Sequence, residues 1–217
     1  MLYIVATPIG NLDDITLRAL KVLKEADLIL AEDTRNTGKL LKRFEIKTPM
    51  KSFHHHSSPE KIAWIVEELE NEKNIALVTD AGTPGIADPA GHLVEAVQKA
   101  NLLVTPIPGS SAITTLLSVS GINTDRFMFV GFLPKKKGRQ TLFKKLANVD
   151  MPIVIFESPM RVIRTLKDIE SYLGDREVII GRELTKLYEE ILRMSTTQAI
   201  KHFDIKKPKG EFVIVVR

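Results

Sequence analysis

The sequence contains no cysteine among its 217 residues. This excludes disulfide bonds, thiol nucleophiles, iron–sulfur clusters and zinc sites built on sulfur, and it is compatible with a reducing compartment. The sequence also has no apolar run approaching the roughly 18 residues that a membrane-spanning helix needs. The N-terminus MLYIVATPIG lacks the basic flank and the small-residue cleavage site of a signal peptide. We therefore expect a soluble, cytoplasmic protein with no membrane partner.

The familiar nucleotide-binding motifs are missing as well. The first apolar run is followed by TPIGN (7–11), which has one glycine where a dinucleotide fingerprint needs three. TGKLL (37–41) departs from a phosphate loop, because Asp33 replaces its first glycine and Leu40 its hydroxyl residue. The histidine run 54–56 does not predict a metal site, because neighbouring side chains of a strand point to opposite faces. Dinucleotide, kinase, GTPase and metal chemistry are therefore disfavoured.

Basic residues gather in the second half of the chain. The formal charge is +4, and the excess lies in KKKGR (135–139), which is followed by Lys144 and Lys145, and in KKPK (206–209). Such clusters are common on solvated surfaces, and they are also typical of surfaces that contact phosphates. Charge alone leaves both interpretations open.

The order of apolar and amphipathic segments predicts two α/β domains. Up to residue 121, short apolar runs alternate with helical patterns, which predicts right-handed crossovers and a mostly parallel sheet. After GINTD (121–125) the segments are richer in strand patterns, which predicts an antiparallel or mixed sheet. We expect domains at 1–121 and 122–217. A capping residue followed by proline predicts helix starts at Ser58–Pro59, Asp88–Pro89 and Ser158–Pro159.

The candidate site follows from the strand ends, because ligands of parallel sheets bind at the carboxyl ends of the strands. TPIGN, EDTR (32–35), DAGTPGIADP (80–89) and PGSSA (108–112) each follow an apolar run and should meet at one edge. Glycine and proline let main-chain groups approach a ligand closely. Neither DAGTPGIADP nor PGSSA contains Lys or Arg, so these loops favour a ligand with a positive centre and an adenine over a phosphate. Asp80 would face the positive centre.

Eight segments in this order resemble the small-subunit ribosomal RNA methyltransferase I family of the tetrapyrrole methylase superfamily: TPIGNLDDIT, AEDTRNTGKLL, LVTDAGTPGIADP, PIPGSSA, GFLPKKKG, FESPMR, GRELTKLYEE and KGEFVIVV. The resemblance covers nearly the whole chain. It implies a two-domain tetrapyrrole-methylase-like α/β fold (a class III methyltransferase) with S-adenosylmethionine in the cleft between the domains. It also implies 2′-O-methylation of a cytidine ribose in the decoding region of 16S rRNA, by a homodimer.

The resemblance also implies the site residues. The residues that would line the cofactor cleft are Pro8, Ile9, Asp80, Ala81, Gly82, Thr83, Pro84, Ala87, Ser110, Ser111, Ala112, Phe156, Glu157, Lys209, Gly210 and Glu211. Phe156 could instead be a core aromatic, and Glu157 a cap or a surface charge. The candidates for catalysis are Glu32, Asp33, Arg35, Glu183 and Lys186. An interdomain ion-pair network is the alternative for Glu32, Asp33, Arg35, Arg182 and Glu183. Lys186 could hold a phosphate or a ribose.

Three departures from the family pattern affect these expectations. Met160 stands where a histidine is usual, which argues against an essential base there, and Ser57 and Ser58 replace the usual Asn and Glu. Family members commonly continue past KGEFVIVV into a small helical domain, whereas this sequence ends at Arg217. Two alternatives remain: a superfamily methyltransferase for a tetrapyrrole or a modified protein side chain, and a non-catalytic ribosome-assembly module.

Overall fold

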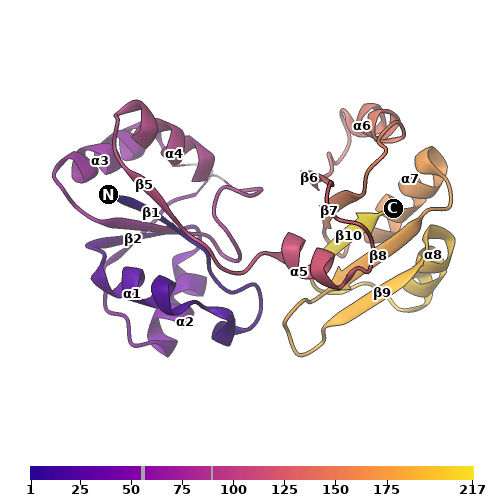
Figure 1. Cartoon of the computed structure of the whole chain (residues 1–217), viewed down its shortest axis with the longest axis horizontal. Coiled ribbons are helices and arrows are strands. Elements are labelled where there is room, and N and C mark those ends of the chain that lie inside the picture. The colour runs from indigo at the N-terminus through magenta and orange to yellow at the C-terminus, as the bar shows by residue number, and fades with distance from the viewer. Residues whose placement is uncertain (55–56, 89) are drawn as a thin grey trace. The chain divides into compact units, whose positions relative to one another are not determined.

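The computed structural model describes residues 1–54, 57–88 and 90–217. It divides into two compact units, Met1–Ser111 and Ala112–Arg217 (Figure 1). Helix α5 (Ala112–Val119), which precedes the boundary expected at residue 121, groups with the second unit. Within the described ranges, no helix is both long enough and apolar enough to cross a membrane.

The first unit is built on a parallel five-stranded sheet with the order β3-β2-β4-β1-β5. All four neighbouring pairs are parallel, as the alternation of strands and helices predicts. Strands β2 and β4 are buried along their whole length, which explains why they read as continuous apolar runs. The strands are β1 (Leu2–Val5), β2 (Leu28–Ala31), β3 (Met50–Ser52), β4 (Ile75–Val78) and β5 (Val104–Ile107).

Helices cover both faces of this sheet (Figure 1). Alternate residues of β4 serve the two faces: Ile75 and Leu77 pack with α3 and α4, and Ala76 and Val78 pack with α1 and α2. Ser58 caps α3 as predicted, because its side chain accepts a hydrogen bond from the N–H of Lys61. The helices are η1 (Leu12–Asp14, a 3₁₀ turn), α1 (Leu17–Glu25), α2 (Thr34–Arg43), α3 (Pro59–Glu70) and α4 (Ala90–Lys99).

The second unit contains a mixed sheet with the order β6-β7-β10-β8-β9. Only the β6–β7 pair is parallel, so the mixed sheet expected from the sequence is confirmed. Phe143, Leu166 and Phe203 bring α6, α7 and α8 into one core with this sheet. The remaining elements are β6 (Met128–Phe132), α6 (Arg139–Leu146), β7 (Ile153–Glu157), α7 (Val162–Leu173), β8 (Glu177–Arg182), β9 (Glu190–Ser195), α8 (Thr196–Ile205) and β10 (Phe212–Val216).

The helix start predicted at Ser158–Pro159 is wrong, because α7 begins at Val162. The hydroxyl of Ser158 accepts a hydrogen bond from Nε of Arg161 instead of capping a helical N–H. At the start predicted at Asp88–Pro89, Pro89 lies outside the described residues. There Asp88 accepts a hydrogen bond at 2.8 Å from the N–H of Ala90, the first residue of α4.

Candidate functional site

Three of the loops at the carboxyl edge of the first sheet are hydrogen-bonded to one another. Thr7, after β1, and Gly82, after β4, exchange two main-chain hydrogen bonds of 2.9 and 3.0 Å. The hydroxyl of Thr83 donates to the carbonyl of Ser110, after β5, at 3.3 Å. We call these three loops (7–11, 80–88 and 108–111), together with residues 32–35 after β2, the loop rim. These loops are adjacent because β2, β4, β1 and β5 are neighbours in a parallel sheet.

Glycine is needed at two positions of the loop rim. Gly82 has φ of +81°, a conformation that residues with a Cβ atom rarely adopt. A Cβ atom at Gly109 would lie 3.0 Å from Cβ of Ala6, so glycine lets 108–111 pack closely on the end of β1 without displacing Ala6. Most candidate side chains here are small, and Pro8, Ile9 and Pro84 are buried. Around Gly82 and Gly109 the loop rim therefore presents mainly main-chain groups.

Carboxylates gather where β2 and β4 end. Asp33 caps α2, and its main-chain N–H donates to Oδ1 of the exposed Asp80 at 3.1 Å. Oε2 of Glu32 accepts a hydrogen bond from the N–H of Asp80 at 3.5 Å. Arg35 donates to both oxygens of Asp33, with Nη2 at 2.6 Å from Oδ2. Glu32, Asp33, Arg35 and Asp80 are thus brought together within the first unit.

The pairing of Asp33 with Arg35 fixes the charges of both groups. The side-chain hydrogen bond from Arg35 holds the pKa of Asp33 well below its usual range, and Asp33 raises the pKa of Arg35. A carboxylate with a lowered pKa is a weak general base. This geometry suits Arg35 as the residue that orients Asp33.

The second half of loop 80–88 is held by its own carboxylate. The N–H of Gly85 donates to both oxygens of Asp88 at 2.8 Å. Ala87 has φ of +64°, a strained value for a residue with a Cβ atom. Loop 80–88 is therefore fixed at Asp88, while Asp80 stays exposed at its other end.

A second charged cluster lies within the second unit. Nζ of Lys186 is 2.9 Å from Oε1 of Glu183 and 3.1 Å from Oε2 of Glu211. The N–H of Glu211 donates to the same Glu183 oxygen at 2.9 Å. Nε of Arg182 donates to the carbonyl of Lys209 at 2.7 Å. Candidate residues from 183–186 and 209–211 are thus brought together. The ion pairs Arg35–Asp33, Lys186–Glu183 and Lys186–Glu211 each lie within one unit.

Hydrogen bonding keeps Lys186 and Glu183 charged. Burial alone would lower the pKa of Lys186, but its hydrogen bonds to Glu183 and Glu211 outweigh burial and raise this pKa. Burial would raise the pKa of Glu183, but bonds from Lys186 and the N–H of Glu211 outweigh it and lower this pKa. Lys186 is therefore a protonated donor at neutral pH, suited to holding an anion or a hydroxyl oxygen.

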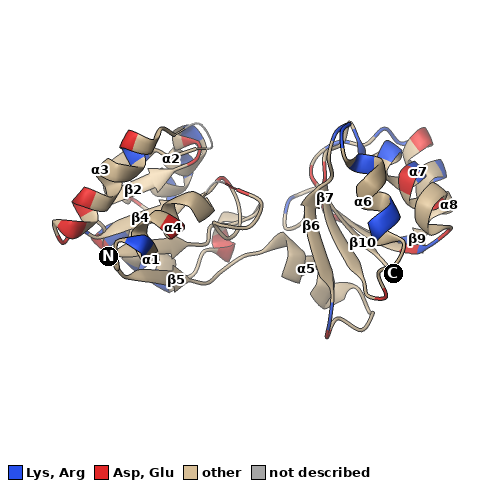
Figure 2. Cartoon of the chain, turned by 90° about the horizontal axis from the view of Figure 1, so that it is seen from above, with Lys and Arg blue, Asp and Glu red and all other residues tan. Residues whose placement is uncertain are grey.

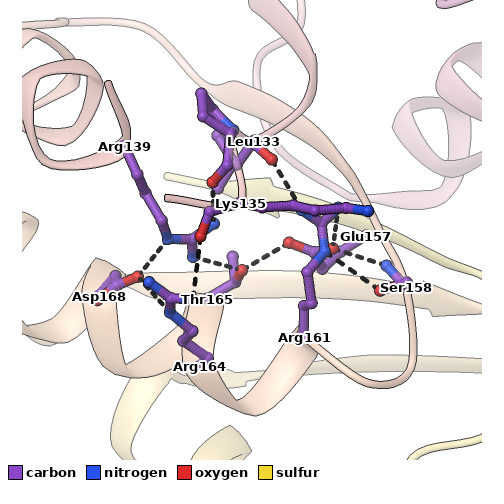
Figure 3. Close-up of polar contacts among 10 residues, drawn as sticks. Leu133, Lys135, Arg139, Glu157, Ser158, Arg161, Arg164, Thr165 and Asp168 are labelled. Atoms are coloured by element: carbon purple, nitrogen blue, oxygen red, sulfur yellow. Dashed lines mark hydrogen bonds and ion pairs between the residues drawn. The ribbon is translucent and has the colours of Figure 1, made fainter. Parts of the chain in front are cut away.

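Phe156 and Glu157 end strand β7, and their side chains are used differently. Phe156 is half-buried, with its ring centroid 4.9 Å from that of Phe129 and 5.7 Å from that of Phe132. The side chain of Glu157 is 0% exposed and accepts a hydrogen bond from Oγ1 of Thr165 at 2.6 Å (Figure 3). Glu157 is therefore not a surface charge, and a ligand would meet only its main chain.

The side chains that hold Glu157 are not among the site residues predicted from the sequence. Nη2 of Arg161 lies 2.8 Å from Oε1 of Glu157, and Thr165 accepts a hydrogen bond of 2.8 Å from Nη2 of Arg139. Arg161, Thr165 and Asp168 are spaced i, i+4 and i+7, which places them on one helical face. That spacing was the available signal. Arg139 counted as part of an exposed basic cluster, yet it is only 3% exposed.

The described residues give no support for a metal centre. Among them, no group of three His, Asp or Glu side chains could hold a metal ion. His55 and His56 of the histidine run lie outside the described residues.

Comparisons with known proteins identify the family of the chain. The family of tetrapyrrole (corrin/porphyrin) methylases matches residues 1–200. A Thermotoga maritima protein named "Ribosomal RNA small subunit methyltransferase I" is 49% identical over 215 residues, covering 99% of this chain and 97% of its own length. A Synechocystis protein of the same name is 48% identical and is matched over 100% of this chain and 78% of its own length.

A solved structure shows the same fold. The crystal structure of diphthine synthase superposes with a TM-score of 0.79 at 16% identity, covering 99% of this chain and 88% of that one. At this identity the likeness bears on the fold alone. The chain belongs to the tetrapyrrole methylase family and, within it, to the ribosomal RNA small subunit methyltransferase I family.

Proposed function

We propose that this protein is an S-adenosylmethionine-dependent methyltransferase that methylates the ribose 2′-hydroxyl of a cytidine in the decoding region of 16S rRNA. The observation that carries the proposal is the near full-length identity of 44–49% to proteins named for small-subunit rRNA methylation. The hydrogen-bonded loop rim and the basic second unit support it. We further propose that the enzyme is a cytoplasmic homodimer, as the family resemblance implies.

The residues of the loop rim fit the proposed cofactor. The exposed carboxylate of Asp80 suits a ligand with a positive centre, and the glycine-rich loops offer main-chain groups for an adenine and a carboxylate. Just before Asp80, Oγ1 of Thr79 is buried and has no hydrogen-bond partner among the described residues. When bound, S-adenosylmethionine supplies a methyl group on a sulfonium, which is already activated for transfer.

Most of the protein's contribution is then alignment. Holding an acceptor oxygen in line with a methyl donor can supply about 7–11 kcal/mol of the barrier. We propose that loops 7–11, 80–88 and 108–111 hold the donor, with Phe156 and 209–211 completing the cofactor contacts. Lys186, protonated and fixed by Glu183, is proposed to hold the ribose or a phosphate of the acceptor.

Removal of the hydroxyl proton is the smaller contribution. A positioned base typically contributes about 10²- to 10⁴-fold in rate. Glu32 is the carboxylate proposed for this step. Glu183 has a lowered pKa and is paired with Lys186, so it is a weak base and we assign it to fixing Lys186. Asp33 is tied to Arg35 by several hydrogen bonds, so we assign this pair to positioning.

Transfer of a labelled methyl group tests the proposal. Purified protein is incubated with radiolabelled S-adenosylmethionine and with small ribosomal subunits or their RNA, and label in the RNA is counted. We expect label in the RNA with wild-type protein and much less with Asp80→Ala. Normal cofactor binding without any labelled RNA would contradict the proposal and favour a non-catalytic assembly module. Label in a tetrapyrrole substrate alone would indicate a different acceptor.

A further inference from the structure

The loop between β6 and α6 carries three successive lysines at the surface of the second unit. We call residues 133–138 the basic loop. Lys135, Lys136 and Lys137 are exposed, and Gly138 follows with φ of +82°. Figure 2 shows basic residues gathered over this loop, α6 and α7. The loop rim belongs to the other unit, so the basic loop is not one of its parts.

Three arginines hold three successive carbonyl groups of the basic loop (Figure 3). Their Nη1 atoms donate to Leu133, Pro134 and Lys135 in turn. The bonds are Arg161 to Leu133 at 2.8 Å, Arg139 to Pro134 at 3.3 Å and Arg164 to Lys135 at 3.1 Å. A loop fixed at consecutive carbonyls loses little conformational freedom when it binds a ligand. The basic loop is therefore preorganised.

One of these arginines, Arg139, is itself anchored in the core. Arg139 is 3% exposed; its Nε donates to Oδ2 of Asp168 at 2.7 Å and its Nη2 to Oγ1 of Thr165 at 2.8 Å. Thr165 donates in turn to the buried Glu157 at the end of β7. Because this network is satisfied internally, it fixes the loop, and the lysines remain outside it.

A cavity of about 360 Å³ lies beside the basic loop. Its lining includes the cations Lys136, Arg139 and Arg164 and a single carboxylate, Asp168. Asp168 is paired at 2.7 Å with Arg139, while Nε of Arg164 is 4.0 Å away. Lys136 forms no ion pair within the described residues. Three cations thus line the cavity against one carboxylate, which leaves the lining with a net positive charge.

We propose that this cavity binds a backbone phosphate of the RNA acceptor. Lys136 and the half-exposed Arg164 supply the charge, and the exposed Gln140 and Thr141 from the first turn of α6 supply polar groups to the lining. The inference rests on the proposed function, since it takes RNA as the acceptor. A phosphate contact anchors RNA without reading its sequence, so the cavity contributes affinity.

The test compares Lys136→Ala with Lys201→Ala, an exposed lysine of α8 outside the cavity lining. Binding of a fluorescently labelled decoding-region RNA transcript is followed by anisotropy across a salt series. The slope of log K against log salt is negative, and loss of one phosphate contact makes it shallower by about 0.7 for single strands. This corresponds to an affinity about fivefold weaker near 0.1 M salt. We expect this from Lys136→Ala, recovery in Lys136→Arg, and no change in Lys201→Ala. Calorimetry should give an unchanged cofactor affinity for all three.

An unchanged salt slope in Lys136→Ala, or an equal loss in Lys201→Ala, would overturn the phosphate site. These results are separable from failure of the proposed function. If wild-type protein methylates the RNA while Lys136→Ala binds it normally, only the phosphate site is wrong. If wild-type protein binds the cofactor but neither binds nor methylates the RNA, both proposals fail.

Discussion

Gly210 lies against Glu183, and replacing it by alanine tests the geometry of the second charged cluster. A Cβ atom at Gly210 would lie 2.5 Å from Cγ, Cδ and Oε1 of Glu183. Gly210 also has φ of +89°. Gly174 is a matched control, because it has the same φ and nothing within 4 Å of the added Cβ atom. The two substitutions place a Cβ atom at the same positive φ and differ in the displacement of Glu183.

The expected magnitudes follow from these contacts. A residue with a Cβ atom in such a backbone conformation costs about 1–3 kcal/mol, and this applies to both variants. In Gly210→Ala the side chain of Glu183 must also swing away. It then loses hydrogen bonds of 2.9 Å from the N–H of Glu211 and from Lys186. Such bonds to charged groups are worth about 1.5–3 kcal/mol each, which we reduce to about 1–3 kcal/mol for both because the cluster is partly exposed.

Urea unfolding measures the difference directly. We expect Gly210→Ala to lower the free energy of unfolding by about 1–3 kcal/mol more than Gly174→Ala does, and to lower methyl transfer as well. In a Glu183→Ala background the extra cost should disappear, because the displaced side chain is gone. Equal destabilisation by the two glycine substitutions would refute the close approach of 210 to Glu183.

Three further predictions concern the charged groups. Thr165→Val should lower the free energy of unfolding by about 2–4 kcal/mol in urea, because it leaves the buried Glu157 and Arg139 each short of a partner, while Thr165→Ser should recover most of it. Lys186→Met should destabilise by a constant amount between about pH 6 and 9. The difference in the free energy of unfolding between wild type and Lys186→Met should shrink at lower pH, because protonation of Glu183, whose pKa is lowered in the folded protein, removes the ion pair. It should also shrink at higher pH, because deprotonation of Lys186, whose pKa is raised, does the same. A difference that stays constant from about pH 3 to 11, which spans the ordinary pKa values of both groups, would contradict this. Asp80→Ala should weaken S-adenosylmethionine binding by about tenfold or more in calorimetry, whereas an unchanged affinity would remove Asp80 from the cofactor site.

Much of the fold was predictable because most strands of the first sheet stand out in the sequence as short apolar runs. Apolar runs such as 27–33 and 74–80 predicted the parallel sheet, since buried parallel strands need apolar residues on both faces. The adjacency of Thr7, Gly82 and Ser110 followed from the same order, because carboxyl ends of neighbouring parallel strands share one edge. The loop rim was therefore accessible to local patterns.

Polar contacts between residues far apart in the sequence could not be predicted from such local patterns. Arg139 reads as the end of an exposed basic run, yet it is buried against Asp168, 29 residues away. Ser158 followed by Pro159 has the pattern of a helix start, but the buried Glu157 binds Arg161 and the main-chain N–H of Ser158 instead. In both cases the burial of a charge decides the outcome, and burial depends on the packed fold.

The most direct test of the central proposal is a nucleotide-resolution map of 2′-O-methylation in small-subunit RNA. Unmodified RNA or subunits are incubated with S-adenosylmethionine and either wild-type protein or Asp80→Ala. We predict one new 2′-O-methyl group, on a cytidine of the decoding region, with wild-type protein, and a much weaker signal with the variant. A complete absence of new 2′-O-methylation, with normal cofactor binding, would contradict the proposed activity.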